Sequence, residues 1–182
     1  MNKFFYAFLL VMQLTMLSGQ KQFNVLLFSK TAGWHHESIK DGVDAIMDLG
    51  QKHHFNVEWQ ENAIWFTDEK LKNYDVIIFL NTTGDILNEA QQKAMENFIR
   101  SGKGFVGIHS ASDTEYDWEW YVKMVGRMFV IHPQVQTAYM KILNKRFPGM
   151  DAWQDYQLWT DEWYEFTPEK NSGLNYLMTV DE

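Results

Sequence analysis

Short runs of consecutive apolar residues recur through the first part of the chain. Three of them, rich in Val, Ile, Leu and Phe, occupy residues 23–28, 75–80 and 104–108. Runs of this length and composition are typical of parallel strands that are buried on both faces of a sheet. Residues 55–59 alternate apolar and polar positions instead, which indicates a strand nearer the edge of the same sheet.

The segments between these runs carry apolar residues at the spacing of amphipathic helices. Residues 38–51 and residues 88–101 each place such residues on one side of a helix. Asn88, with Gln91 three positions on, has the pattern of a capping box at a helix start. The alternating order of strands and helices predicts an α/β fold with a mostly parallel sheet and helices on both faces. Beyond this alternation the pattern predicts one helix and two strands, at residues 117–128, 135–143 and 174–180.

The composition is that of one globular domain. The chain has 182 residues, of which 46% are hydrophobic and 22% are charged, so it can bury a core and disorder is not expected. A formal net charge of −8 repels phosphate backbones, so nucleic acid is not an expected partner. The chain has no cysteine, which excludes thiol nucleophiles, thiolate metal ligands and disulfides.

The N-terminal segment predicts a secretory signal peptide over residues 1–20. Lys3 precedes an apolar stretch at residues 4–17, and small residues follow it. This stretch is shorter than the ~20 residues of a membrane-spanning helix, although an uncleaved N-terminal anchor is an alternative. We expect cleavage near Gly19 or Gln20, and export to the periplasm or the outside. Membrane contact would come through this signal alone, and the folded domain would span residues 21–182.

Three glycines match a dinucleotide-binding motif in spacing but not in context. Gly102, Gly104 and Gly107 fit G-x-G-x-x-G, which in nucleotide-binding folds follows a strand and opens a helix. Here the pattern ends a predicted helix and runs through a predicted strand. No nucleotide cofactor is therefore expected.

Polar residues collect directly after the predicted parallel strands, where ligands of open α/β sheets bind. The loops after the first, third and fourth strands contain His36, Thr83, Asp85, His109 and Asp113. A neutral imidazole binds a metal ion or moves a proton near neutral pH, and a histidine that only hydrogen-bonds its own loop is the equal alternative. His35 and His36 cannot both point inward on one turn, and we favour His36 because it is closer to the helix. His53 and His54 follow the first helix at the opposite end of the sheet, and we interpret them as solvated.

Two further segments combine aromatic rings with carboxylates. Trp118 and Trp120 lie in EYDWEWY, and Trp163 follows Asp161 and Glu162 in LWTDEWYEF. Flat rings suit the apolar faces of sugars, and carboxylates accept hydrogen bonds from sugar hydroxyls. Ordinary packing of the rings and loop capping by the carboxylates are the alternative interpretations.

These segments together resemble the trehalose-utilisation (ThuA-like) family, from about residue 23 to the last residue. The resemblance is carried by HHESIKDG, by the long block LNTTGDILNEAQQKAMENFIRSGKGFVGIHSASDTEYDWEWYVKMVGRMF, and by HPQVQTA, TDEWYEF and LMTVDE. The family implies a three-layer, flavodoxin-like fold of the class I glutamine amidotransferase type. In amidotransferases of this fold, a catalytic cysteine follows the strand equivalent to residues 104–108. Here His109 stands near that position, so amidotransferase chemistry is not expected.

The resemblance also implies a role in the use of trehalose and related disaccharides, or of 3-keto-glycosides. It implies that histidines at the sheet edge hold a divalent metal such as zinc, with His36, His109 and His132 as candidate ligands beside Glu162. The family normally continues past the TVDE segment, so we expect a truncated domain that ends at Glu182. A missing strand would leave an open sheet edge, from which we expect pairing into a homo-oligomer.

The leading hypothesis is an exported enzyme that acts on a small carbohydrate. Its catalytic residues would be His109, as general acid/base or metal ligand, and Asp113 and Glu162, which would orient a histidine or bind hydroxyls. The residues expected to contact the substrate are His36, Thr83, Asp85, Trp118, Trp120, Asp161 and Trp163. The rival hypothesis is a carbohydrate-binding module without catalysis, and a third is a scaffold that binds no sugar.

Overall fold

The computed structural model of the chain describes residues 21–181, so the predicted signal peptide lies outside the described residues. The described chain forms two compact units, the first ending at Ala111 and the second beginning at Ser112. Between residues 21 and 181, no helix is both long enough and apolar enough to cross a membrane.

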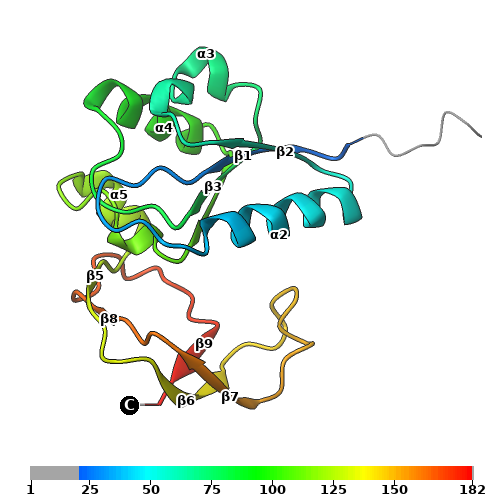
Figure 1. Cartoon of the computed structure of the whole chain (residues 1–182), viewed down its shortest axis with the longest axis vertical. Coiled ribbons are helices and arrows are strands. Elements are labelled where there is room, and N and C mark those ends of the chain that lie inside the picture. The colour runs from blue at the N-terminus through cyan, green and yellow to red at the C-terminus, as the bar shows by residue number, and fades with distance from the viewer. Residues whose placement is uncertain (1–20, 182) are drawn as a thin grey trace, which may run out of the picture. The chain divides into compact units, whose positions relative to one another are not determined.

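The first unit is built on a four-stranded parallel sheet (Figure 1). Its strands are β1 (Asn24–Phe28), β2 (Asn56–Gln60), β3 (Val76–Leu80) and β4 (Gly104–Ile108). They lie in the order β2-β1-β3-β4, and Leu27 of β1 pairs with Trp59 of β2 and with Ile78 of β3. Each strand lies within a residue of the position that the apolar pattern predicts, and the alternating strand β2 is at an edge of this sheet.

Helices cover both faces of this sheet, which makes it the middle layer of three. α2 (Ile39–Lys52) lies on one face, whereas α3 (Asp68–Leu71) and α4 (Glu89–Arg100) lie on the other (Figure 1). A short 3-10 turn, η1 (Ala63–Trp65), precedes α3, and another, η2 (Ala111–Asp113), follows β4. The predicted α/β class, with a parallel sheet between two layers of helices, is confirmed.

Alternation along the strands divides the core between the two faces of the sheet. Val25 and Leu27 of β1 and Ile78 of β3 pack in one cluster with Ile39 and Val43 of α2. Successive side chains of a strand point to opposite faces, so the residues between these positions face α3 and α4. Both faces of the central strands are therefore buried, as their continuous apolar runs predict.

On the face opposite α2, three phenylalanines form the centre of the core. Phe28 of β1 and Phe79 of β3 both contact Phe66, at ring-centroid distances of 4.7 and 6.0 Å. All three side chains are almost fully buried. Burial of each such ring stabilises the fold by roughly 1.5–3 kcal/mol. A one-residue slip of either strand would move these rings to the wrong face, so the register is strongly specified.

α4 begins and ends where the sequence predicts. Asn88 and Gln91 form a capping box, in which each side chain accepts a hydrogen bond from the other residue's backbone N–H. The box satisfies two backbone donors that the first turn of a helix leaves without intrahelical partners. Gly102 follows the helix with a φ of +94°, a left-handed conformation that glycine adopts without strain.

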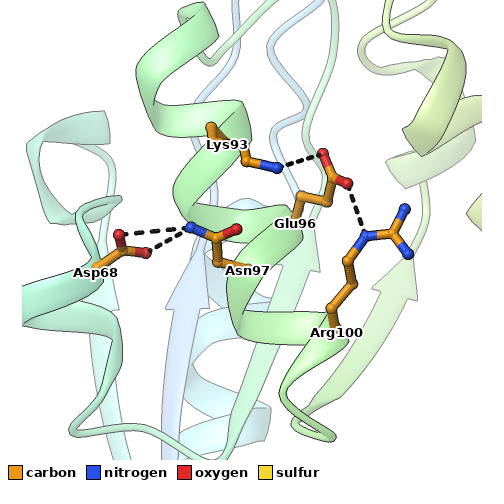
Figure 2. A network of polar contacts seen from close by, with 5 residues as sticks. All are labelled: Asp68, Lys93, Glu96, Asn97 and Arg100. Carbon is orange, nitrogen blue, oxygen red and sulfur yellow. Dashed lines mark hydrogen bonds and ion pairs between the residues drawn. The ribbon is translucent and has the colours of Figure 1, made fainter.

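Side chains on α4 also make polar contacts, which Figure 2 shows from close by. Asn97 donates to the carboxylate of Asp68 in α3, at 3.2 Å from Oδ1. Glu96 accepts from Arg100 at 2.7 Å and lies 3.7 Å from Lys93. Ion pairs between exposed side chains contribute little to stability, so the Asn97–Asp68 bond, which joins two helices, is the structurally informative contact.

β4 differs from the predicted strand that is buried on both faces. Val106, at its centre, is 44% exposed. In the described part of the chain β4 pairs only with β3, so it is an edge strand of the sheet. Two of its five residues, Gly104 and Gly107, carry no side chain, and the apolar content of such a strand does not distinguish an edge from a centre.

The second unit contains α5 (Glu119–Val125) and two small antiparallel sheets. β5 (Phe129–Ile131) pairs with β8 (Glu165–Phe166), and β6 (Gln136–Ile142) lies between β7 (Tyr156–Asp161) and β9 (Met178–Val180). The sequence pattern predicts α5, β6 and a longer version of β9. It does not predict β5, β7 or β8, which are short or lack regular alternation.

Candidate functional site

Backbone hydrogen bonds join the loops that follow β1, β3 and β4 at the carboxyl edge of the parallel sheet. The N–H of Ala32 donates to the carbonyl oxygen of Thr83 at 2.7 Å. The N–H of Asn81 donates to the carbonyl oxygen of His109 at 2.8 Å. The segment after β3 therefore anchors the loops of both neighbouring strands.

Thr83 and Ser110 are buried structural residues of this edge. Thr83 Oγ1 donates to the carbonyl oxygen of Trp34 at 2.8 Å and accepts from the N–H of Gly33 at 3.2 Å. Ser110 Oγ donates to the carbonyl oxygen of Thr82 at 3.0 Å. The side chain of Thr83, a predicted substrate contact, thus holds the loop that leads to the first histidines, and its exposed fraction is 0%.

The anchored loops bring His36 and His109 into contact, although 73 positions separate them in the sequence. Their Nε2 atoms lie 3.1 Å apart, and the rings meet edge to face with an angle of 88° between their planes. The distance is that of a hydrogen bond, so one Nε2 carries a proton and donates it to the lone pair of the other. His35 is exposed. The pair is therefore a two-imidazole site that can accept and release a proton.

The histidine pair supplies part of a ligand set for the divalent metal that the family resemblance implies. Two imidazole nitrogens on a tetrahedral zinc would lie roughly 3.3 Å apart, which is close to the observed 3.1 Å. Across residues 21–181, however, no three His, Asp or Glu side chains are grouped so as to hold an ion. His132, the third predicted ligand, belongs to the second unit. Catalytic zinc sites use about three protein ligands, and neither unit by itself supplies them among the described residues.

An open cleft of about 750 Å³ lies beyond the carboxyl ends of β1, β2 and β3. Its polar lining includes Lys30, Gln60, Glu61 and the predicted substrate residue Asp85. In the strand order β2-β1-β3-β4, the chain passes from β1 to β2 on one side of β1 and then to β3 and β4 on the other side. The direction of the connections therefore reverses between β1 and β3, and flavodoxin-like folds bind ligands at this switch point. Gln60 and Glu61 were not predicted as site residues, although their position at the end of a predicted strand carries the same signal.

His132 and Glu162 form a separate histidine–carboxylate contact in the second unit. His132 Nδ1 lies 2.7 Å from the carbonyl oxygen of Pro133, and this bond places a proton on Nδ1. Nε2 is then the basic nitrogen of the neutral ring, and it lies 3.8 Å from Glu162 Oε2. The ring of Tyr164 stacks on that of His132, with centroids 5.8 Å apart. Protonation of His132 would convert the contact with Glu162 into an ion pair.

Two tyrosines stand among the predicted carboxylates of the second unit. The hydroxyl of Tyr116 donates to Asp113 Oδ1 at 2.6 Å. Burial is the main cause that raises the pKa of Tyr116, and this hydrogen bond raises it further. Burial is also the main cause that raises the pKa of Tyr164, and the negative charges of Glu162, Asp113 and Asp161 raise it further. Both phenols are therefore neutral at physiological pH, and Asp113, Asp161 and Glu162 share one electrostatic neighbourhood.

The predicted sugar-stacking tryptophans fall into two kinds. Trp118 stacks on Tyr121 and meets Trp120 in a tilted arrangement, with centroids 5.7 and 5.1 Å apart, so these rings pack on one another at the start of α5. Trp163 instead donates its Nε1–H to the carbonyl oxygen of Gln136 at 2.9 Å and lines a cleft of the second unit. Its ring has the arrangement expected of a ligand platform, whereas Trp118 and Trp120 have that of packing residues.

The predicted site residues thus divide between the two units. The first unit brings together the two histidines of its carboxyl edge, with Thr83 in the wall of that edge and Asp85 in the cleft. The second unit brings together His132 and Glu162, with Asp113 and Asp161 in the same neighbourhood. The tyrosines of the second group were not assigned to the site from sequence, although they lie in the two aromatic segments that it singled out.

Comparison with known proteins places the fold and the family. Among solved structures, a ThuA-like protein from Bacteroides uniformis is similar with a TM-score of 0.75 and 24% identity, over 88% of this chain and 69% of that one. A ThuA-like protein from Parabacteroides merdae has a TM-score of 0.74 and 14% identity, over 88% of this chain and 68% of that one. At these identities the likeness shows the fold, which is flavodoxin-like.

The family is shown by a separate comparison. No match is found among curated proteins. The family model named ThuA, described as trehalose utilisation, matches residues 24–182, which is most of the sequence and includes both groups of site residues. The chain therefore belongs to the ThuA family.

Proposed function

We propose that the protein is an enzyme that acts on a sugar, either a disaccharide such as trehalose or a 3-keto-glycoside, with His36 and His109 as its proton-transfer groups. Membership of the ThuA family supports a role in carbohydrate utilisation. The observation that carries the proposal is the 3.1 Å distance between the two Nε2 atoms at the carboxyl edge of the sheet. Imidazoles are the side chains best suited to move protons near neutral pH.

The two rings divide the roles of base and acid. With one proton between the two Nε2 atoms, the accepting ring has a lone pair there and the donating ring has an N–H. A water molecule placed about 2.8 Å from both Nε2 atoms replaces the contact between the rings. Its proton moves to the lone pair of the first ring, while the second ring donates a hydrogen bond to the same oxygen. As the water oxygen forms its bond to the anomeric carbon, the glycosidic C–O bond breaks, and the imidazolium that has formed returns the proton to the leaving glycosidic oxygen.

The polar cleft of the same unit supports binding of the sugar. Asp85 and Glu61 present carboxylates, which accept hydrogen bonds from hydroxyls. Lys30 donates to the carbonyl oxygen of Ile86 at 2.7 Å, which fixes its ammonium group at the cleft wall. In this proposal the cleft binds hydroxyls of the sugar, and the histidine pair, which is not part of the cleft lining, moves the proton.

Alanine variants of the two histidines test the proposal. His109→Ala and His36→Ala should each lower turnover by at least about 100-fold, the lower end of what a positioned acid/base contributes. His35→Ala is the matched control, because this residue is exposed and adjacent in sequence, and its turnover should stay within about twofold of wild type. The measurement is initial rates on a panel of disaccharides and their 3-keto forms. Wild-type turnover by His109→Ala would contradict the proposal.

Carbohydrate binding without catalysis is the second candidate function, and the aromatic cleft of the second unit favours it. In that case no sugar of the panel is turned over by the wild-type protein. Binding measured by calorimetry would then be lost in Trp163→Ala and kept in His109→Ala. The two candidates therefore differ in whether His109 matters at all.

We further propose that the protein is exported, on the basis of the signal-like residues 1–20. Expression of the full chain in a Gram-negative host should give a periplasmic product that begins near Gln20, as read by intact mass. Replacement of Leu9 and Leu10 by Asp should interrupt the apolar stretch and abolish this processing. A full-length cytoplasmic product from the unmodified chain would contradict export.

A further inference from the structure

The second unit contains a cleft of about 880 Å³ that the proton-transfer proposal does not use. Its volume lies within the range of small-molecule binding sites. Its lining combines aromatic rings with charged side chains, namely Arg127, Tyr139, Trp163, Tyr164, Glu165 and Asp181. All of these residues belong to the second unit, so the cleft is complete without the first.

The aromatic rings of the cleft are oriented by their neighbours and leave ring surface accessible. The indole of Trp163 is held by its bond to the carbonyl oxygen of Gln136. The rings of Tyr164 and Phe166 meet at 60° with centroids 5.9 Å apart. Tyr139 is 51% exposed and Phe166 is 43% exposed. Oriented rings with accessible faces are surfaces on which the apolar face of a pyranose ring stacks.

Arg127 is held at the cleft by an acidic partner. Its Nε donates to the hydroxyl oxygen of Tyr176 at 3.0 Å, and its Nη2 lies 3.6 Å from Glu169. Tyr176 in turn donates to the same carboxylate at 2.7 Å. Within the described residues no hydrogen bond uses Nη1 of Arg127. A guanidinium that is oriented in this way can donate to a ligand oxygen with little loss of side-chain entropy.

The charges of the cleft select against anionic ligands. Glu169 offsets the positive charge of Arg127, whereas Glu165 and Asp181 add two carboxylates to the lining. Asp181 Oδ1 accepts from the N–H of Tyr139 at 2.6 Å, and a carboxylate has further lone pairs for hydroxyls. The charged side chains at the cleft are therefore negative on balance, and the formal net charge of the whole chain, −8, is negative too. A phosphate or carboxylate group would therefore be repelled, whereas sugar hydroxyls would be bound.

We propose that this cleft binds a neutral, unphosphorylated disaccharide. One sugar ring stacks on Trp163, and hydroxyls of the disaccharide bond to Arg127, Glu165 and Asp181. The inference rests on the proposed function for the chemical class of the ligand, but it requires no proton transfer by His36 or His109.

Titration calorimetry on the full chain tests the cleft, with trehalose, maltose and sucrose as neutral probes and trehalose 6-phosphate as the anionic probe. At least one neutral disaccharide should bind, and the phosphorylated sugar should bind at least about tenfold more weakly than trehalose. Trp163→Ala should weaken binding of the neutral sugar by at least about tenfold. Tyr139→Ala should do the same, and its exposed position means that its folding should be unaffected. The matched control is Trp159→Ala, because this partly exposed tryptophan of β7 does not line the cleft.

His109→Ala separates this inference from the proposed function. The binding that Trp163→Ala removes should remain in His109→Ala, whether or not this variant turns sugar over. The inference is overturned if none of the neutral disaccharides binds, if Tyr139→Ala and Trp163→Ala bind like Trp159→Ala, or if trehalose 6-phosphate binds as tightly as trehalose. Normal binding together with undiminished turnover by His109→Ala would overturn only the proton-transfer proposal.

Discussion

At the scale of single residues, Asp75 ties together the starts of three strands. Its Oδ2 accepts from the N–H of Asn24 at 2.9 Å, at the beginning of β1. Its Oδ1 accepts from Lys103 Nζ at 2.7 Å, directly before β4. Both contacts lower the pKa of Asp75, and the hydrogen bond from Lys103 has the larger effect. The charged form of this carboxylate is therefore the form that the fold stabilises.

The stabilisation by Asp75 should depend on pH. Because the folded pKa lies below that of an unfolded carboxyl group, about 3.9, the contribution is complete above about pH 5 and is lost as the pH falls through the folded value. Asp75→Asn keeps an oxygen for the N–H of Asn24 but removes the charge. The urea midpoint of wild type should exceed that of the variant at pH 7, by a free energy of up to about 1 kcal/mol for so exposed a pair. The gap should close toward pH 3, and a gap that is constant over this range would contradict the assignment.

Other single residues show why a site cannot be fully assigned from residue type. Thr83 follows a strand and has a hydroxyl, which is the pattern of a ligand-binding residue, yet it is buried and bonded to the backbone of Gly33 and Trp34. Tyr164 is one of many aromatic residues in its segment, and only its proximity in space to Asp113 distinguishes it. Long-range contacts of this kind leave no periodic signal in the sequence.

At the scale of elements, the capping box of α4 is a local device with a measurable effect. Asn88→Ala should lower the free energy of unfolding by about 1 kcal/mol, because the N–H of Gln91 loses its side-chain acceptor. Lys93→Ala, on the exposed side of the same helix, is the control and should change stability by less than about 0.5 kcal/mol. Urea denaturation of the two variants is the measurement. Equal midpoints for the two would mean that the box contributes nothing.

Elements of the first unit could be predicted from sequence because local signals agreed there. The buried parallel strands appear in the sequence as continuous apolar runs. The helix α4 has both a capping box at its start and a glycine after its end. Ligands of parallel sheets bind beyond the carboxyl ends of the strands, and this rule predicts that His36 and His109 lie at the same edge. The second unit carries weaker signals. Its strands β5 and β8 have three and two residues, which is too short for alternation to show. Its antiparallel pairing, and with it the contact of His132 with Glu162, followed from no local pattern.

At the scale of the whole molecule, the chain builds both units without a disulfide, because it has no cysteine. Each unit carries its own cluster of imidazole and polar groups, and the first cluster depends on loops that are far apart in sequence. The central claim is that His36 and His109, which the anchored loops of β1 and β4 bring together, act as one proton-transfer unit. Residues that act as a unit have strongly non-additive effects on catalysis.

A double-mutant cycle on kcat/KM is therefore the most direct test, with wild type, His36→Ala, His109→Ala and the double variant assayed on the same sugar. The account predicts that the double variant is no more than about twofold slower than the slower single variant, because either change already removes the pair. Losses that multiply in the double variant, or a single variant with the activity of wild type, would contradict it.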